Sequence, residues 1–327
     1  MKTANALTLL KTAAALPCPK LPRTAVVAPM APGNDRDKHR RAVLLLHGLC
    51  SSSLEVRLFA RTLREHGFHV VTPTLSGYSA SEAAAAGGDS AADHRRWIDD
   101  ACAEVDRLRA TFDDVSLCGV SLGATLALAV AAERPQALTG LSLISTTLFF
   151  DGWNISPWRF MLPIAYHTPL GHWYRYKETP PYGVKNERVR AWIADQLSRG
   201  SLSSAGASTI PTPSLREADR LIRLVKRSLG DVRTPTLMIH AREDDVASLA
   251  NVRFVESRIG SDLFRQVIVD DSYHMITLDN DRELAAMKTV LFLCAAVEWR
   301  EQAWLSASNW SELDRGGNPT NTRSRSA

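Results

Sequence analysis

A serine between two glycines is the first feature of this 327-residue chain that could do chemistry. Ser121 is the centre of a G-x-S-x-G pattern at residues 119–123, with apolar residues 115–118 before it and the alanine- and leucine-rich residues 124–133 after it. A strand, a tight turn and a helix are the context in which this pattern holds a serine on a strained elbow. The helix N-terminus would also direct partial positive charge at the serine. We therefore predict that Ser121 is a nucleophile, and a chance match in a turn is the alternative.

A histidine is placed to activate this serine. A serine hydroxyl is a poor nucleophile at neutral pH and needs a base beside it, which in turn needs an anionic partner. Ser121, the acidic residues 243–245 and His274 each follow the carboxyl end of a predicted strand. Such ends share one edge of a parallel sheet, so we predict His274 as the base. A structural hydrogen-bonding role is the alternative for any single histidine of the nine.

The acid has several candidates. Glu243, Asp244 and Asp245 are adjacent, and Asp151 lies shortly after the preceding predicted strand. The pattern alone leaves these alternatives open. We predict Asp244.

Two backbone N–H groups are expected to stabilise an oxyanion, because acyl transfer needs donors aimed at the developing charge. The N–H of Leu122 lies next to the predicted nucleophile at the start of a helix. The N–H of Leu49 lies in a loop of small residues after the predicted strand 42–46. His47 in the same loop is a second conceivable base, but we expect it to shape the loop.

Alternating strands and helices must position these residues. An apolar run without alternation at residues 42–46 predicts a central parallel strand that is covered on both faces, and residues 141–145 predict another buried strand. Further strands are predicted at residues 68–71, 115–118, 236–240 and 266–269. Helices are predicted at residues 54–65, 91–109, 124–133, 215–229, 247–259 and 281–299. The fourth of these follows a capping-box pattern at residues 214–217. The alternation predicts an α/β fold with a doubly wound, mostly parallel sheet.

The alternation of strands and helices stops between residues 147 and 213, and this segment contains eleven of the 23 Trp, Tyr and Phe residues. We predict an inserted helical cap here, over the strand ends where ligands bind in such sheets. Trp153 and Tyr166 of this cap, together with Tyr273, are the candidate substrate-binding residues, and a separate small core is the alternative. The core is then residues 41–146 and 214–300. Residues 1–40 are expected to form a flexible extension, and residues 301–327 a tail with a disordered end.

Composition excludes several classes of protein. A scattered net charge of +4 does not indicate nucleic-acid binding. Five widely spaced cysteines without a CxxC pair indicate neither a disulfide framework nor a zinc site, and we expect no metal or cofactor. No apolar run has the length of a membrane span, so stable membrane insertion is not expected. Lys11 interrupts the apolar N-terminus, which favours a cytoplasmic protein over an exported one. Nothing in the pattern indicates an oligomeric state.

Four motifs in register resemble the bacterial carboxylesterase and monoacylglycerol-lipase branch of the α/β-hydrolase superfamily. They are residues 44–49, 119–123, 241–244 and 271–277, and the resemblance covers about residues 41 to 299. It implies the α/β-hydrolase fold and a serine hydrolase without a cofactor, acting on medium-chain acyl esters or monoglycerides. It also implies Asp244 as the acid, and Leu49 and Leu122 as the oxyanion donors. Tyr273 stands where this family usually has glycine, which would narrow the pocket.

We therefore predict a serine hydrolase that cleaves carboxylic esters with an apolar acyl or alkyl group through an acyl-enzyme on Ser121. Its substrate would be a small ester or a lipid-like molecule. A thioesterase or an acyltransferase would use the same residues, and a catalytically silent binding protein would be expected to lack one of them. A peripheral membrane protein acting on lipid is a further alternative, because the N-terminus is apolar and the cap aromatic. Epoxide and haloalkane hydrolysis are disfavoured, since both normally place a carboxylate at this position.

Overall fold

A parallel sheet forms the centre of the protein. The computed structural model describes residues 40–79, 93–156, 175–177, 179–199, 202–203, 206–207 and 209–316. Its six-stranded sheet has the order β10-β9-β4-β3-β1-β2, and all neighbouring strands are parallel. The strands are β1 (Arg41–Leu46), β2 (His69–Val71), β3 (Asp114–Val120), β4 (Leu141–Ile144), β9 (Thr236–Ala241) and β10 (Phe264–Val269). This confirms the predicted fold class, and each strand lies within a few residues of its expected position.

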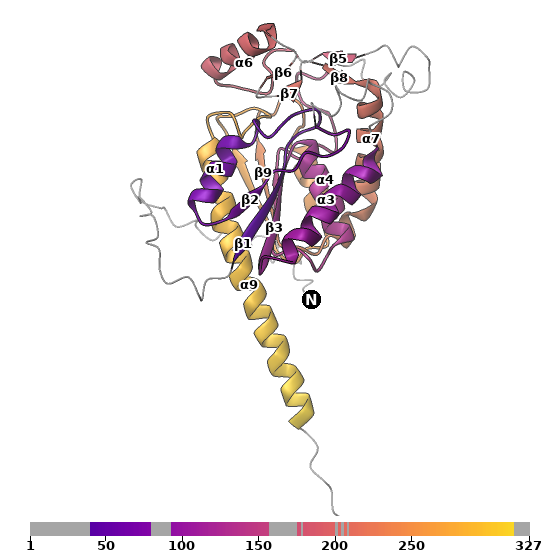
Figure 1. The fold of residues 1–327 in the computed structure, drawn as a ribbon, viewed down its shortest axis with the longest axis vertical. Coiled ribbons are helices and arrows are strands. Elements are labelled where there is room, and N and C mark those ends of the chain that lie inside the picture. The colour runs from indigo at the N-terminus through magenta and orange to yellow at the C-terminus, as the bar shows by residue number, and fades with distance from the viewer. Residues whose placement is uncertain are drawn as a thin grey trace, which may run out of the picture. The chain divides into compact units, whose positions relative to one another are not determined.

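Helices cover both faces of the sheet (Figure 1). One face packs against α3 (His94–Arg109), α4 (Leu122–Glu133), α7 (Thr212–Ser228) and α8 (Ala250–Glu256) in one apolar cluster. The other face packs against α1 (Arg57–Glu65) and α9 (Arg282–Gly316) in a second cluster. Leu44 of β1 belongs to the first cluster and its neighbour Leu45 to the second. Because alternate side chains of a strand face opposite sides, burial on both faces accounts for the uninterrupted apolar run.

The helices differ from prediction mainly at their ends. Helix α1 begins at Arg57 rather than at residue 54, because Glu55 is turned into the interior. Helix α7 begins at Thr212, so the predicted capping box was wrong: Pro211 is the N-cap, and Glu217 bonds to another helix. Helix α8 begins at Ala250, and α9 continues to Gly316, past its expected end near residue 299.

The segment between β4 and α7 contains more strand than its sequence indicated. Helix α6 (Glu187–Arg199) is accompanied by two short antiparallel pairs, β5 (Arg175–Lys177) with β8 (Thr209–Pro211), and β6 (Leu202–Ser203) with β7 (Gly206–Ala207). Val184 and Ile193 pack with Met275 and Leu278 in a third apolar cluster. This segment therefore rests on the chain that follows β10.

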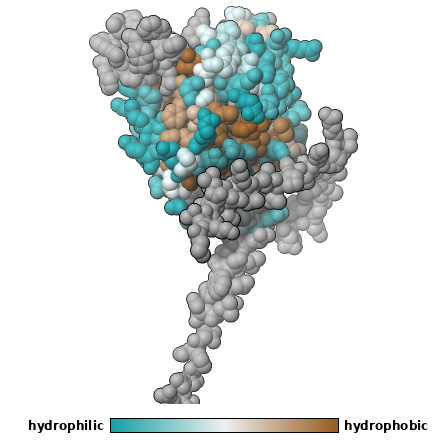
Figure 2. All heavy atoms as spheres, turned by 180° about the vertical axis from the view of Figure 1, so that it is seen from behind, coloured by the Kyte–Doolittle hydropathy of each residue, from teal (hydrophilic) through white to brown (hydrophobic). Residues whose placement is uncertain are grey.

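Figure 2 shows brown side chains gathered in one area of a largely teal face. The large apolar side chains that are exposed in the described part of the chain are Leu54, Trp153, Trp192, Leu284, Leu291 and Trp299. Among the described helices, none combines the length and the apolar character that crossing a membrane requires.

Candidate active site

Ser121 lies on a strained turn between β3 and α4. Its backbone has φ 55° and ψ −120°, a conformation that a residue with a side chain rarely adopts. The turn is possible because its two glycines leave room: a Cβ on Gly119 would overlap the carbonyl oxygen of Gly123, and one on Gly123 would overlap that of His47. The Ser121 N–H donates to the carbonyl of Ile144 at 2.9 Å. This elbow presents the hydroxyl at the carboxyl edge of the sheet, as the pattern predicted.

A continuous chain of hydrogen bonds joins the three residues predicted to act together. The Nε2 atom of His274 lies 2.8 Å from Ser121 Oγ. Its Nδ1 atom lies 3.0 and 2.9 Å from the two carboxylate oxygens of Asp244. Because a carboxylate only accepts, Nδ1 carries a proton, and in the neutral ring Nε2 presents its lone pair to the serine. Asp244 and His274 are both buried.

Loops after β9 and β10 fix this geometry. Asp244 Oδ1 accepts the N–H groups of Val246 and Ala247 at 2.8 and 2.7 Å, so the backbone orients the carboxylate. The backbone carbonyl of His274 accepts a hydrogen bond from the Ser145 hydroxyl at 2.6 Å. The backbone N–H of His274 donates to Asp245 Oδ1 at 3.3 Å. Asp245 therefore bonds the backbone of His274, whereas Asp244 bonds the imidazole.

Charge pairing controls the protonation of this pair. Burial alone would lower the pKa of His274, but the charge of Asp244 and its hydrogen bond outweigh burial and raise it above 6.5. Burial alone would raise the pKa of Asp244, but the charge and hydrogen bond of His274 hold it below 3.8. The site is thus built to hold an imidazolium beside a carboxylate.

The loop after β1 lies against the start of α4, because Gly123 contacts the backbone of residues 46 and 47. The amide N–H groups of Leu49 and Leu122 donate to no carbonyl within the described residues. The Leu122 N–H is one of the first in its helix, where such groups have no partner inside the helix. The two predicted oxyanion donors therefore lie in neighbouring segments.

The His47 ring takes part in holding this loop. One ring nitrogen bonds the Gly48 carbonyl at 2.8 Å and the other bonds Ser79 Oγ at 3.0 Å. Burial lowers its pKa, which favours the neutral ring. Both nitrogens are thus engaged away from Ser121, in keeping with the expected loop-shaping role.

The remaining sequence predictions concern the substrate-binding residues and the alternative acid, Asp151. Trp153 is 59% exposed; its indole N–H donates to the Glu243 carbonyl at 3.0 Å, and its ring meets that of Tyr273 edge-on at 5.4 Å. Tyr166 lies outside the described residues. Asp151, the remote alternative for the acid, accepts the N–H and hydroxyl of Ser248 at 2.8 and 2.7 Å. It is therefore engaged with the chain leading into α8.

Several polar residues around the site were not predicted. Thr147 Oγ1 lies 3.4 Å from Ser121 Oγ. The His240 Nε2 atom lies 3.3 Å from Asp244 Oδ2 and 2.7 Å from the Ala247 carbonyl, to which it donates. Thr147 could have been found, because it follows a strand that ends at the same edge of the sheet. His240 lies within a strand and carries no such signal.

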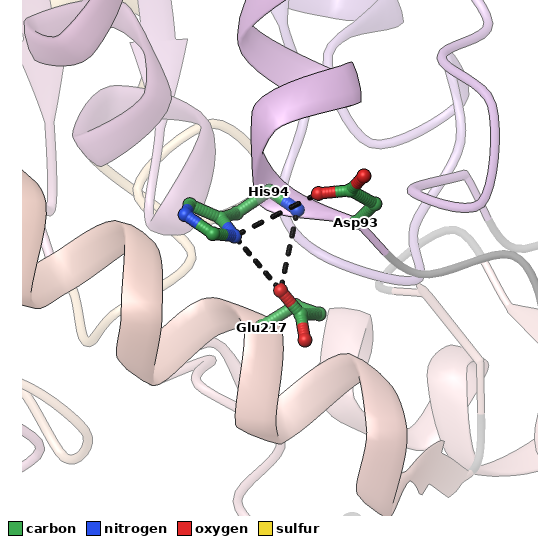
Figure 3. A group of neighbouring side chains, drawn as sticks. All are labelled: Asp93, His94 and Glu217. Atoms are coloured by element: carbon green, nitrogen blue, oxygen red, sulfur yellow. Dashed lines mark hydrogen bonds and ion pairs between the residues drawn. The ribbon is translucent and has the colours of Figure 1, made fainter.

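A second polar cluster joins α3 to α7 (Figure 3). The ligand atoms of Asp93, His94 and Glu217 lie within 4.8 Å of one another, a spacing that could hold a metal ion. However, the buried Glu217 carboxylate already accepts His94 Nδ1 at 2.8 Å and Arg220 at 2.6 Å. Asp93 caps α3 by accepting the N–H of Arg95 at 2.9 Å. These contacts give the cluster a structural role in fastening the two helices.

Known proteins resemble this chain over most of its length. Residues 37–281 match the family described as serine aminopeptidase, S33 (Hydrolase_4). A carboxylesterase of Bacillus subtilis (strain 168) is 21% identical over 77% of this chain and 92% of its own. A thermostable monoacylglycerol lipase of Bacillus sp. (strain H-257) is 24% identical over 76% and 89%.

A solved structure shares the fold of this chain. A soluble variant of monoglyceride lipase from Saccharomyces cerevisiae, in complex with a substrate analog, superposes with a TM-score of 0.65. It is 14% identical, over 81% of this chain and 89% of its own. The likenesses confirm the branch that the four sequence motifs resemble.

Proposed function

The chain belongs to the serine aminopeptidase S33 family (Hydrolase_4) and is a serine ester hydrolase. We propose that it cleaves esters with an apolar acyl or alkyl group through an acyl-enzyme on Ser121. One observation carries this proposal: His274 Nε2 lies 2.8 Å from Ser121 Oγ, while its Nδ1 is held by Asp244. A base in that position removes the serine proton as the hydroxyl attacks.

Asp244 serves the base in two ways. It holds the tautomer that leaves the Nε2 lone pair free, and it stabilises the imidazolium that forms during attack. Because the N–H groups of Val246 and Ala247 fix its carboxylate, little reorganisation is needed when charge develops. The adjacent Asp245 has its pKa raised, chiefly by burial, and it bonds a backbone N–H. Asp244 is therefore the acid in this proposal.

The N–H groups of Leu49 and Leu122 form the oxyanion hole. When Ser121 attacks an ester carbonyl, the oxygen gains negative charge, and these two donors stabilise it. His274 then protonates the leaving alcohol, which departs and leaves the acyl group on Ser121. Water, deprotonated by the same imidazole, attacks the acyl-enzyme, and collapse of the second tetrahedral intermediate releases the acid and restores the serine.

Residues 147–213 are the cap in this proposal. Asp279 is fully buried and ties this segment to the loop of His274: its carboxylate accepts the N–H groups of Lys185 and Asn186 at 2.6 and 2.9 Å, and that of Tyr273 at 3.0 Å. The Met275 N–H donates to the Gly183 carbonyl at 2.7 Å. A cap fastened beside the reacting residues is well placed to cover the substrate.

Apolar substrates are favoured by the composition of this cap. Trp153 and Tyr273 form an aromatic pair next to the acid and histidine loops. The relatives named a carboxylesterase and a monoacylglycerol lipase point to the same class of ester. We therefore propose a small ester or a lipid-like ester as the substrate.

The proposal is tested by measuring hydrolysis of p-nitrophenyl esters from acetyl to dodecanoyl, with Ser121→Ala as the control. Saturable hydrolysis with an optimal acyl length, lost in the variant, supports it. Hydrolysis of a matched acyl thioester measures thioesterase activity, and hydrolysis of an aminoacyl anilide measures aminopeptidase activity. Turnover of either one in the absence of ester hydrolysis would contradict the proposal.

A further inference from the structure

A carboxyl group lies buried beneath the loop that carries Leu49. Glu55 is only 1% exposed, and its Oε2 accepts the N–H of Gly48 at 2.8 Å. A Cβ added to Gly48 would lie 3.3 Å from the same oxygen, so the carboxyl is in direct contact with the loop backbone. Glu55 precedes α1 and makes no contribution to the apolar face of that helix. Its side chain is therefore directed at the loop.

Leu49 lies between two anchored amides. On one side, the Gly48 N–H is held by Glu55. On the other, the Cys50 N–H donates to the carbonyl of Tyr78 at 2.9 Å, and Cys50 has a positive φ of 52°. A residue with a side chain keeps that conformation only where its surroundings impose it. The two anchors set the direction of the Leu49 N–H between them.

Glu55 interacts electrostatically with His274, the proposed base. Burial raises the pKa of Glu55 to about 7, and the charge of His274 opposes this rise. In return, Glu55 is among the charges that raise the pKa of His274. The Tyr78 hydroxyl donates to the His47 carbonyl at 2.9 Å and fastens the same loop. Glu55 is thus bonded to the loop that carries Leu49 and is coupled electrostatically to His274.

We propose that Glu55 is the positioning residue of the oxyanion hole: by accepting the Gly48 N–H, its carboxyl directs the neighbouring Leu49 N–H towards the oxyanion. This rests on the proposed function, in which Leu49 is a donor. Glu55 acts through the loop and does not touch the substrate. What it supplies is a hydrogen-bond acceptor at a fixed position, and that role does not require a charge.

Two near-isosteric variants separate the acceptor from the charge. Glu55→Gln keeps an acceptor for the Gly48 N–H and removes the charge, whereas Glu55→Met removes both. Replacing a buried ionisable group by one of similar shape is often tolerated, so both variants should fold. We expect kcat of the Met variant to fall about 100-fold, the scale of losing one oxyanion donor, with KM changed less than about threefold. We expect the Gln variant to retain kcat to within about fivefold.

A pair of inhibitors provides a readout that general loosening of the fold would not produce. A trifluoromethyl ketone adds to Ser121 and needs the oxyanion hole, whereas the matching unreactive amide does not. The inhibition constant of the ketone divided by that of the amide should rise in the Met variant about as much as kcat falls. The same ratio should be nearly unchanged in the Gln variant.

Either of two results would overturn the proposal: kcat of the Met variant at the wild-type level, or equal losses in the Gln and Met variants, which would assign the effect to charge. Circular dichroism verifies folding, and Glu55→Leu replaces the Met variant if that variant does not fold. Wild-type protein that hydrolyses no ester would instead refute the proposed function, so the two failures are distinguishable.

Discussion

Glu55→Gln also isolates the energetic cost of burying a carboxyl behind the active-site loop. The pKa of Glu55 is raised from 4.5 to about 7, chiefly by burial. Between these values the unfolded chain releases the proton while the folded protein retains it, so the free energy of unfolding falls as pH rises. At about 1.4 kcal/mol per pKa unit, the loss amounts to about 3 kcal/mol once the pH is above the folded value. Glutamine does not titrate, and the variant avoids this loss.

Urea unfolding of both proteins at a series of pH values measures the effect. The difference in unfolding free energy, variant minus wild type, should rise by about 3 kcal/mol between about pH 4 and about pH 8. Titrating groups that do not interact with Glu55 cancel in this difference, whereas His274, whose pKa Glu55 helps to raise, also contributes to it. A difference that does not change with pH would refute the reasoning, because it would mean that Glu55 ionises as readily in the folded protein as in the unfolded chain.

Other consequences follow from the same contacts. His274 must be neutral to act as the base and its pKa is raised, so kcat/KM of the wild type should fall with decreasing pH around a midpoint above 6.5. Asp244→Asn should move this midpoint to lower pH and lower kcat about 10⁴-fold. Profiles of rate against pH for both proteins measure these effects. Gly123→Ala should cost about 1–3 kcal/mol in thermal unfolding, because the new Cβ overlaps the His47 carbonyl; a neutral effect would contradict the tight elbow. Asp151→Ala should cost about 1 kcal/mol while leaving kcat unchanged, and a large loss of kcat would instead favour Asp151 as the acid.

The sheet and the elbow could be predicted because they depend on local patterns. The strand of residues 41–46 is buried on both faces, which requires an unbroken apolar run. Ser121 lies between two glycines at which a Cβ would overlap backbone atoms. Because β3, β9 and β10 run parallel and end at one edge of the sheet, the loops that carry Ser121, Asp244 and His274 come together there. Choosing Asp244 over its neighbours needed the family resemblance, because adjacent acids differ only in which way their side chains point.

Helix ends were harder to predict because tertiary contacts determine them. Helix α8 begins at Ala250, since Asp244 binds the N–H of Ala247 and Asp151 that of Ser248 just before it. Glu217 matched the capping-box spacing, but it binds His94 of α3 instead. Glu55 fell within a predicted amphipathic helix, and nothing in its local sequence marks it as buried. Contacts between residues distant in the chain leave no local signal.

The central claim, that Ser121 is a nucleophile activated by His274, is tested most directly by reaction with a fluorophosphonate, followed by mass spectrometry of the labelled peptide. The account predicts a single adduct on Ser121, none on Ser121→Ala, and labelling of His274→Ala slowed by at least about 10³-fold. Folded wild-type protein that does not react, or that carries its adduct on another residue, would contradict the account.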